Sequence, residues 1–305
     1  MELTYSKIDG KSRAYKILVG ALAFGVVMLF VSFIVAYLMG HQVWGANNRI
    51  PWGQPLILLI YFIGLSAGAI VVSSLGYVFK KDIYKPIGRI AVYLGLLMMI
   101  GAMVSVIADL GRAEKFWRLF MFFYLNNMQS MFAINGVLYG GYIVLMIIYL
   151  WAVMEGKTRF AVIIGIIDVI WAIGVHTGTG SIFAFMGNRE LMLSSLRPFE
   201  FIAAALSSGT AALILMVVAT YKFTKRQINR ELVVALGRLL IIFMVTLALM
   251  IFFDKMVHNY FPHRSPTEFL FTGPYWYFFW IFQIGMGIVV PLIIVASPAG
   301  RTVKG

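Results

Sequence analysis

Eight apolar runs, each long enough to cross a bilayer, constrain this chain more than any other feature of its sequence. A helix needs about 20 consecutive apolar residues to span a hydrocarbon core of about 30 Å. The runs lie at 17–39, 55–79, 87–108, 131–154, 160–176, 199–221, 235–257 and 275–296. With 61% hydrophobic and 12% charged residues, the composition is not that of a water-soluble domain. The sequence predicts an all-α integral membrane protein with eight transmembrane helices in one polytopic domain, 1–305.

The positive charges are distributed unevenly between the two sides of the predicted membrane domain. One side receives the N-terminus, the C-terminus and the loops 80–89, 155–159 and 222–238, with 17 of the 25 Lys and Arg. Cytoplasmic loops carry such an excess, so we expect both termini in the cytoplasm. The same bias explains the net charge of +13 without a nucleic-acid partner. The first run has no clear small-x-small cleavage site, so we expect an uncleaved helix.

The sequence has no cysteine, which excludes disulfides, iron–sulfur clusters and thiolate-ligated haem within it. All four histidines fall on the predicted outer side, at His41, His176, His258 and His263. Haem with two imidazole ligands would need a second histidine at the depth of His176, and no single run carries two histidines at the spacing of haem ligands. We therefore expect no metal or haem in this chain, and any redox metal in a partner.

The stretch His176-Thr177-Gly178-Thr179-Gly180 ends the fifth run and begins the expected outer loop 177–198. An ionisable ring and a glycine-rich backbone are costly next to lipid. His176 has three interpretations: a satisfied core histidine, a haem ligand, or a proton donor and acceptor for a bound molecule. A ring that exchanges protons near neutral pH suits quinone chemistry, and the glycines would let the backbone approach a flat headgroup.

Four acidic residues lie inside or at the ends of apolar runs: Asp109, Asp168, Glu200 and Asp254. Asp168 is in the middle of its run, about 12 Å of helix rise from His176, where a carboxylate must be protonated or paired. It is a candidate proton relay, or a structural hydrogen-bonding group between helices. Glu200 and Asp254 are further candidates for a proton path, although Asp254 is also expected to pair with its neighbour Lys255.

Three other places bring polar groups to the outer side. Asp109 and Arg112 lie three residues apart. They could form an ion pair at the end of a helix, or Arg112 could order the next loop against a ligand or a docked subunit. Two proline-containing helix starts, near Trp52 and Gln54 and near Arg197, could converge on one outer pocket.

Five motifs in series resemble one family of membrane proteins. They are Pro51-Trp52-Gly53-Gln54-Pro55 followed by Tyr61-x-x-Gly64-Leu65-Ser66-Ala67-Gly68-Ala69; Asp109-Leu110-Gly111-Arg112-x-Glu114-Lys115-Phe116-Trp117; Asn127-x-x-Ser130-Met131; His176-Thr177-Gly178-Thr179-Gly180-x-Ile182-Phe183; and Arg197-Pro198 leading to Ala205-Leu206-x-Ser208-Gly209. Together they cover roughly residues 50–215 and are similar to the NrfD-like membrane subunits of polysulfide reductase type.

The resemblance implies two four-helix bundles that bind menaquinone or ubiquinone near the outer face. It implies a docked ferredoxin-like iron–sulfur subunit with several clusters, which serves a molybdopterin enzyme or a multihaem cytochrome c. Carried onto this sequence, the pocket would involve Trp52, Gln54, Tyr61, the Asp109/Arg112 corner and His176. The protein would then be the quinone-binding subunit of a respiratory oxidoreductase in a prokaryotic inner membrane, not catalytically complete alone.

Two other classes of protein stay open at this stage. A secondary transporter also uses buried acids and glycine-containing helices, but no inverted repeat is seen and the polar groups gather at one face. A purely structural membrane anchor would need neither His176 nor Asp168. The direction of electron flow, the terminal substrate and proton pumping depend on partners outside the chain.

Overall fold

The structure is a computed structural model that describes residues 12–47, 52–110, 112–118, 121, 129–187, 189–223, 229–260, 265–298 and 300. Pro51, Gly111, Asn127 and His263, which appear in the sequence predictions above, lie outside these residues. Within the described ranges the regular structure is helical, and eight helical segments are long and apolar enough to cross a membrane. The predicted fold class is therefore confirmed.

Seven of the spans are single helices, and the eighth is a π-helix continued by a short α-helix. They are α1 (Arg13–Met39), α2 (Gln54–Tyr77), α3 (Lys85–Asp109), α5 (Met131–Met154), α6 (Thr158–Ala184), α7 (Arg197–Phe223), α8 (Arg230–Tyr260), and η4 (Phe278–Val289) with α10 (Val290–Ala296). The short connecting elements are η1 (His41–Trp44), η2 (Asp82–Tyr84), η3 (Ala113–Lys115) and α9 (Ser265–Phe271).

The largest difference from the predicted boundaries is at the end of α6. We predicted that the fifth span stops at 176 and that 177–198 is a loop, but α6 continues to Ala184. Glycine is a poor helix former, yet a Cβ at Gly178 would be 2.7 Å from Asn135 Oδ1, and one at Gly180 would be 2.6 Å from Pro198 Cα. Close packing against α5 and α7 therefore explains both glycines within a helix.

Other boundaries moved by smaller amounts. The helix α8 extends from Arg230 to Tyr260, beyond the predicted 235–257, and α9 lies between the predicted spans 235–257 and 275–296. Serine hydroxyls cap two of the spans: Ser12 Oγ accepts a hydrogen bond from Tyr15 N, and Ser130 Oγ accepts one from Ala133 N. Such caps satisfy backbone donors that a helix leaves unpaired at its start.

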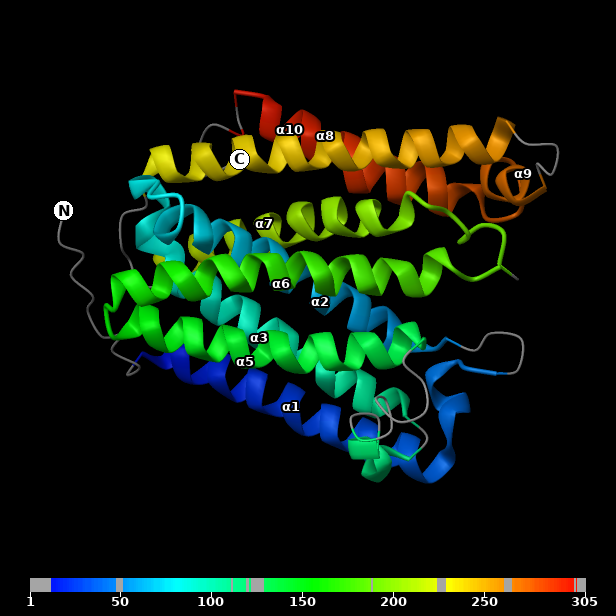
Figure 1. Cartoon of the computed structure of the whole chain (residues 1–305), viewed down its shortest axis with the longest axis horizontal. Helices are drawn as coiled ribbons and strands as arrows, with labels where there is room; N and C mark the ends of the chain where they lie inside the picture. Colours follow the sequence, from blue (N-terminus) through cyan, green and yellow to red (C-terminus); the bar gives the residue numbers. More distant parts are fainter. Residues whose placement is uncertain are drawn as a thin grey trace.

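The centre of the bundle is α2, which packs along α3, α6 and α7 (Figure 1). At the crossing of α2 and α7, a Cβ added at Gly68 would lie 2.6 Å from Gly209 Cα, so the two backbones are nearly in contact. Small residues at such crossings are the usual means of helix association in lipid. The division into two four-helix bundles stays a prediction.

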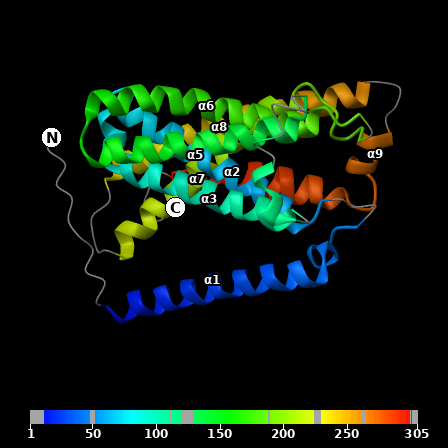
Figure 2. The same ribbon diagram turned by 60° about the horizontal axis from the view of Figure 1, so that its bottom comes forward.

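The first helix, α1, stands beside the bundle and not within it, as Figure 2 shows. None of the residues in its most apolar 18-residue window is buried, and Ala36 near its end is its buried residue. Its last turns line a small hollow with the end of α3, including Ala36 and Tyr37 on one side and Ile107 and Leu110 on the other. The contact of α1 with the bundle is therefore at the predicted outer end.

Candidate functional site

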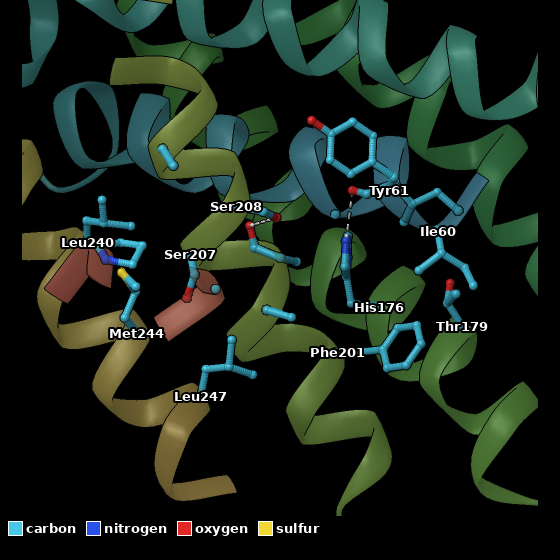
Figure 3. Close-up of a pocket in the computed structure, with 17 residues that line it drawn as sticks. Ile60, Tyr61, His176, Thr179, Phe201, Ser207, Ser208, Leu240, Met244 and Leu247 are labelled. Carbon is cyan, nitrogen blue, oxygen red and sulfur yellow. Dashed lines mark hydrogen bonds between the residues drawn. The ribbon is translucent and has the colours of Figure 1, made fainter. Parts of the chain in front are cut away.

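One cavity, called the main cavity below, has a volume of about 430 Å³ and lies between α2, α6, α7, α8 and the last span (Figure 3). Most of its wall is apolar, with Phe201, Leu240, Met244 and Pro291 among the lining residues. Its polar lining groups are those of Tyr61, His176, Thr179, Ser207 and Ser208. An apolar cavity with a few polar groups is typical of a small-molecule site.

The ring of His176 is buried, with 2% of the residue exposed, and both of its nitrogens face backbone carbonyl oxygens. Nδ1 lies 2.7 Å from Ala172 O in the preceding turn, and Nε2 lies 3.1 Å from Ile63 O on α2. A neutral imidazole has one N–H and can donate only one of these hydrogen bonds, whereas the doubly protonated ring can donate both. The surroundings of His176 therefore have an acceptor ready for a second ring proton.

Thr179 joins the main cavity to a small hollow of about 30 Å³ between α2, α3, α5 and α6, because it lines both. Its hydroxyl lies 2.8 Å from Tyr139 Oη and donates to Val175 O at 2.7 Å. Asn135 also lines the hollow, and its Oδ1 is 3.4 Å from the same hydroxyl. These three side chains form a polar connection from the main cavity toward the start of α5.

Asp168 lies two turns of α6 away from His176, toward the predicted inner side, and is fully buried. Neither carboxyl oxygen has a hydrogen-bond partner among the described residues. Tyr142 and Tyr149 of α5 are its electrostatic neighbours. Among the described residues, Asp168 therefore has no partner for the structural hydrogen bond between helices that was the alternative interpretation.

A group of charged residues, called the ion cluster below, joins the start of α7 to the end of α8. Arg197 Nη1 contacts Glu200 Oε2 at 2.5 Å, and Arg197 Nη2 is 3.4 Å from Asp254 Oδ2. Lys255 Nζ is 2.8 Å from the same Asp254 oxygen, so the expected pairing of Asp254 with Lys255 is confirmed. His258 Nδ1 is 3.6 Å from Asp254 Oδ1 and completes the cluster.

A second cavity, called the outer hollow below, adjoins the ion cluster and has a volume of about 330 Å³. Its lining includes Arg197, Glu200 and Lys255 of the cluster, together with Ile60 and Phe201, which also line the main cavity. The two cavities therefore share part of their walls at the predicted outer end of the bundle.

The structure distributes the predicted site residues over three places. Tyr61 and His176 line the main cavity, whereas Arg197 lines the outer hollow. Trp52 packs edge-on against Phe183 at 5.2 Å between ring centroids, behind the wall of the outer hollow. The remaining three lie at helix ends: Gln54 is exposed at the first residue of α2, Asp109 is half-buried at the last residue of α3, and Arg112 is exposed before η3.

Several polar groups at the site were not assigned to it from the sequence, although Ser208 stands in one of the quoted motifs and the others also have a recognisable signal there. Ser207 and Ser208 are adjacent hydroxyls within an apolar run and line the main cavity. Asn135 and Tyr139 are four residues apart, so one face of α5 carries both. Among the described residues, no group of three or more His, Asp or Glu side chains is arranged to hold a metal ion.

Comparison with known proteins finds a match over most of the chain. Residues 42–303 match the family model described as polysulphide reductase, NrfD. The Hdr-like menaquinol oxidoreductase integral membrane subunit of Archaeoglobus fulgidus is 35% identical over 98% of this chain and 75% of the relative. One subunit of the selenate reductase of Mesobacillus selenatarsenatis is 28% identical over 92% of this chain and 74% of the relative. One subunit of the polysulfide reductase of Wolinella succinogenes is 26% identical over 85% and 89%.

Proposed function

This chain belongs to the NrfD polysulphide reductase family, and from that premise we propose that it binds a menaquinone or ubiquinone headgroup beside His176 and exchanges electrons with an iron–sulfur partner. The observation that carries the proposal is the main cavity, where a buried imidazole and hydroxyls stand in an apolar wall. A bound quinone would supply a carrier of two electrons and two protons.

The residues of the main cavity fit a flat, largely apolar headgroup with polar oxygens. Gly64 lies on the wall, where an added Cβ would be 3.3 Å from Ser208 Oγ, so a larger residue would narrow the cavity. Ser208 and His176 come from different helices that border the same space, as Figure 3 shows. The names of relatives add support: one is a menaquinol oxidoreductase subunit, and others belong to selenate and polysulfide reductases.

In this proposal His176 holds and releases the proton that accompanies electron transfer. Its Nε2 faces Ile63 O, and both residues line the main cavity. A second ring proton gains a carbonyl acceptor there, which offsets part of the cost of a buried charge. Asp168 is proposed as a relay toward the inner side, and Glu200 and Asp254 as groups of a path at the outer side.

A test of His176 compares the whole complex carrying His176→Gln with the unmodified complex. We expect quinol-dependent reduction of the partner's clusters to fall by about 100-fold or more, the usual contribution of a positioned acid or base. Reduction of the clusters by dithionite should be unchanged, because that reaction bypasses the quinone site. Tyr93→Phe, at an exposed position of α3, is the control. If turnover survives in His176→Gln, the protein acts as an anchor or binds quinone elsewhere.

The proposed partner is tested separately by purification in a mild detergent. We expect an iron–sulfur subunit with several clusters to co-purify, together with a molybdopterin enzyme or a multihaem cytochrome c. Iron and acid-labile sulfide in the complex, and cluster signals in electron paramagnetic resonance, are the measurements. Purification of this protein without any iron–sulfur protein, from membranes that retain quinol-dependent activity, would contradict the proposed partner.

A further inference from the structure

The outer hollow has polar groups to which the proposed function assigns no ligand: it places Glu200 only on a proton path. Glu200 is 6% exposed, and one of its carboxyl oxygens, Oε2, is bound by Arg197. The other oxygen, Oε1, is buried and has no hydrogen-bond partner among the described residues. Arg197 Nε is likewise buried and has no hydrogen-bond partner among the described residues, while Arg197 Nη2 donates to Leu191 O at 2.9 Å. Two residues of one cavity lining thus each carry a buried polar atom without a hydrogen-bond partner among the described residues.

The charges of the ion cluster favour a neutral ligand over an anionic one. The formal charges of Arg197 and Lys255 cancel those of Glu200 and Asp254, and all four are joined through ion pairs. A phosphate would have to compete with two carboxylates for the same cations and would be repelled by the Glu200 carboxylate. A ligand hydroxyl, by contrast, can donate a charge-assisted hydrogen bond to a carboxylate.

The other walls of the outer hollow suit an aromatic ring. Phe183 and Phe201 both line it and stack with ring centroids 5.4 Å apart at an interplanar angle of 21°. Gln283 of η4 adds an amide that can donate to or accept from a second ligand oxygen. An apolar slot with an aromatic wall and polar groups at its border matches a hydroquinone headgroup.

The position of the outer hollow relates it to the main cavity. Arg197 and Glu200 are in the first turn of α7, whereas Ser208 lies further along the helix axis, about 16 Å from Arg197 and about 12 Å from Glu200. Ile60 and Phe201 border both cavities. The two cavities therefore adjoin, and the outer hollow is the nearer of the two to the face where the partner is proposed to dock.

We infer that the outer hollow is a second position for the hydroquinone headgroup, in which a ligand hydroxyl donates a hydrogen bond to the Glu200 carboxylate and the ring lies against Phe201. This inference rests on the proposed function, because it takes the same class of ligand. It adds a distinct place, nearer the partner, and assigns Glu200 as a ligand-binding residue.

The test is photolabelling of the purified complex with a photoreactive azido-naphthoquinone, followed by mass spectrometry of the peptides. Leu191, Met192, Leu270 and Gln283 line the outer hollow alone, whereas Ser207, Ser208 and Met244 line the main cavity alone. We call the first group the outer set. We expect residues of both groups to be labelled, and we expect excess unlabelled quinone to suppress the labelling of both. In Glu200→Gln, labelling of the outer set should fall by about tenfold, the effect of losing a hydrogen bond to a charged group, while labelling of the main cavity persists.

Two further variants make the result independent of the stability of the ion cluster. Met192→Trp places a large ring at the wall of the outer hollow without altering a charged residue, and should abolish labelling of the outer set alone. Glu190→Gln, an exposed position in the same segment, should leave the labelling of both sets unchanged.

Two outcomes overturn the inference and leave the proposed function standing. One is labelling of the main cavity alone in the unmodified complex, and the other is labelling of the outer set only by a photoreactive phosphatidylglycerol. Absence of any quinone-suppressible labelling overturns both.

Discussion

Asp168 and His176 are two buried ionisable residues of one helix with different surroundings. Both ring nitrogens of His176 face backbone carbonyls, whereas neither carboxyl oxygen of Asp168 has a partner among the described residues. A buried polar group without a hydrogen bond is destabilising. Asp168 therefore costs folding free energy where it stands, which is the pattern expected of a residue kept for a function.

Replacing Asp168 with leucine separates its functional role from a structural one. We expect Asp168→Leu to raise the free energy of unfolding by about 1–3 kcal/mol, because a buried polar group without a partner is removed. Quinol turnover by the complex should fall at the same time. Thermal denaturation in detergent and the turnover assay give the two measurements, with Asp168→Asn as the variant that keeps the side-chain shape. A lower melting temperature for Asp168→Leu would mean that the acid is structural.

At the scale of helices, the eight spans could be predicted from the sequence because each is a long apolar run, but the end of α6 could not. Thr177, Gly178 and Gly180 are weak helix formers, and their local sequence indicates a loop. Their helical state depends on Asn135 and Pro198, which approach from α5 and α7. Contacts between distant segments are absent from local patterns, so the main cavity and the ion cluster could not be assembled from the sequence, although His176 was identified.

The crossing of α2 and α7 provides a prediction about packing. A Cβ at Gly209 would lie 2.5 Å from Gly68 Cα, so Gly209→Ala must push the two helices apart. We expect a loss of about 1–3 kcal/mol in the free energy of unfolding, the usual cost of overpacking. The matched control is Gly20→Ala in α1, where an added Cβ meets no atom within 4 Å. Its melting temperature in detergent should be unchanged or slightly raised, and equal losses in both variants would contradict the proposed packing.

At the scale of the whole molecule, the predicted orientation can be tested because the sequence has no cysteine. Single cysteines introduced as Glu190→Cys and Glu155→Cys occupy exposed positions at opposite ends of α6. With both termini in the cytoplasm, a membrane-impermeant maleimide should label position 190 in intact spheroplasts and position 155 only after permeabilisation. The reverse pattern would place the ion cluster and the proposed partner on the cytoplasmic side.

The separation of α1 from the bundle has a consequence for how this sequence can vary. A residue that packs in the bundle, such as Ile63 or Ile70 of α2, is constrained by the shape of its neighbours. A residue of α1 such as Leu22 or Phe24 is exposed on the isolated protein and needs only to be apolar. Saturation mutagenesis should therefore find Leu, Ile, Val, Phe and Met freely interchangeable over most of α1, while the same exchanges in α2 are penalised. Evolution would then preserve the hydrophobicity and length of α1, whereas in α2 it would preserve the identity of each side chain.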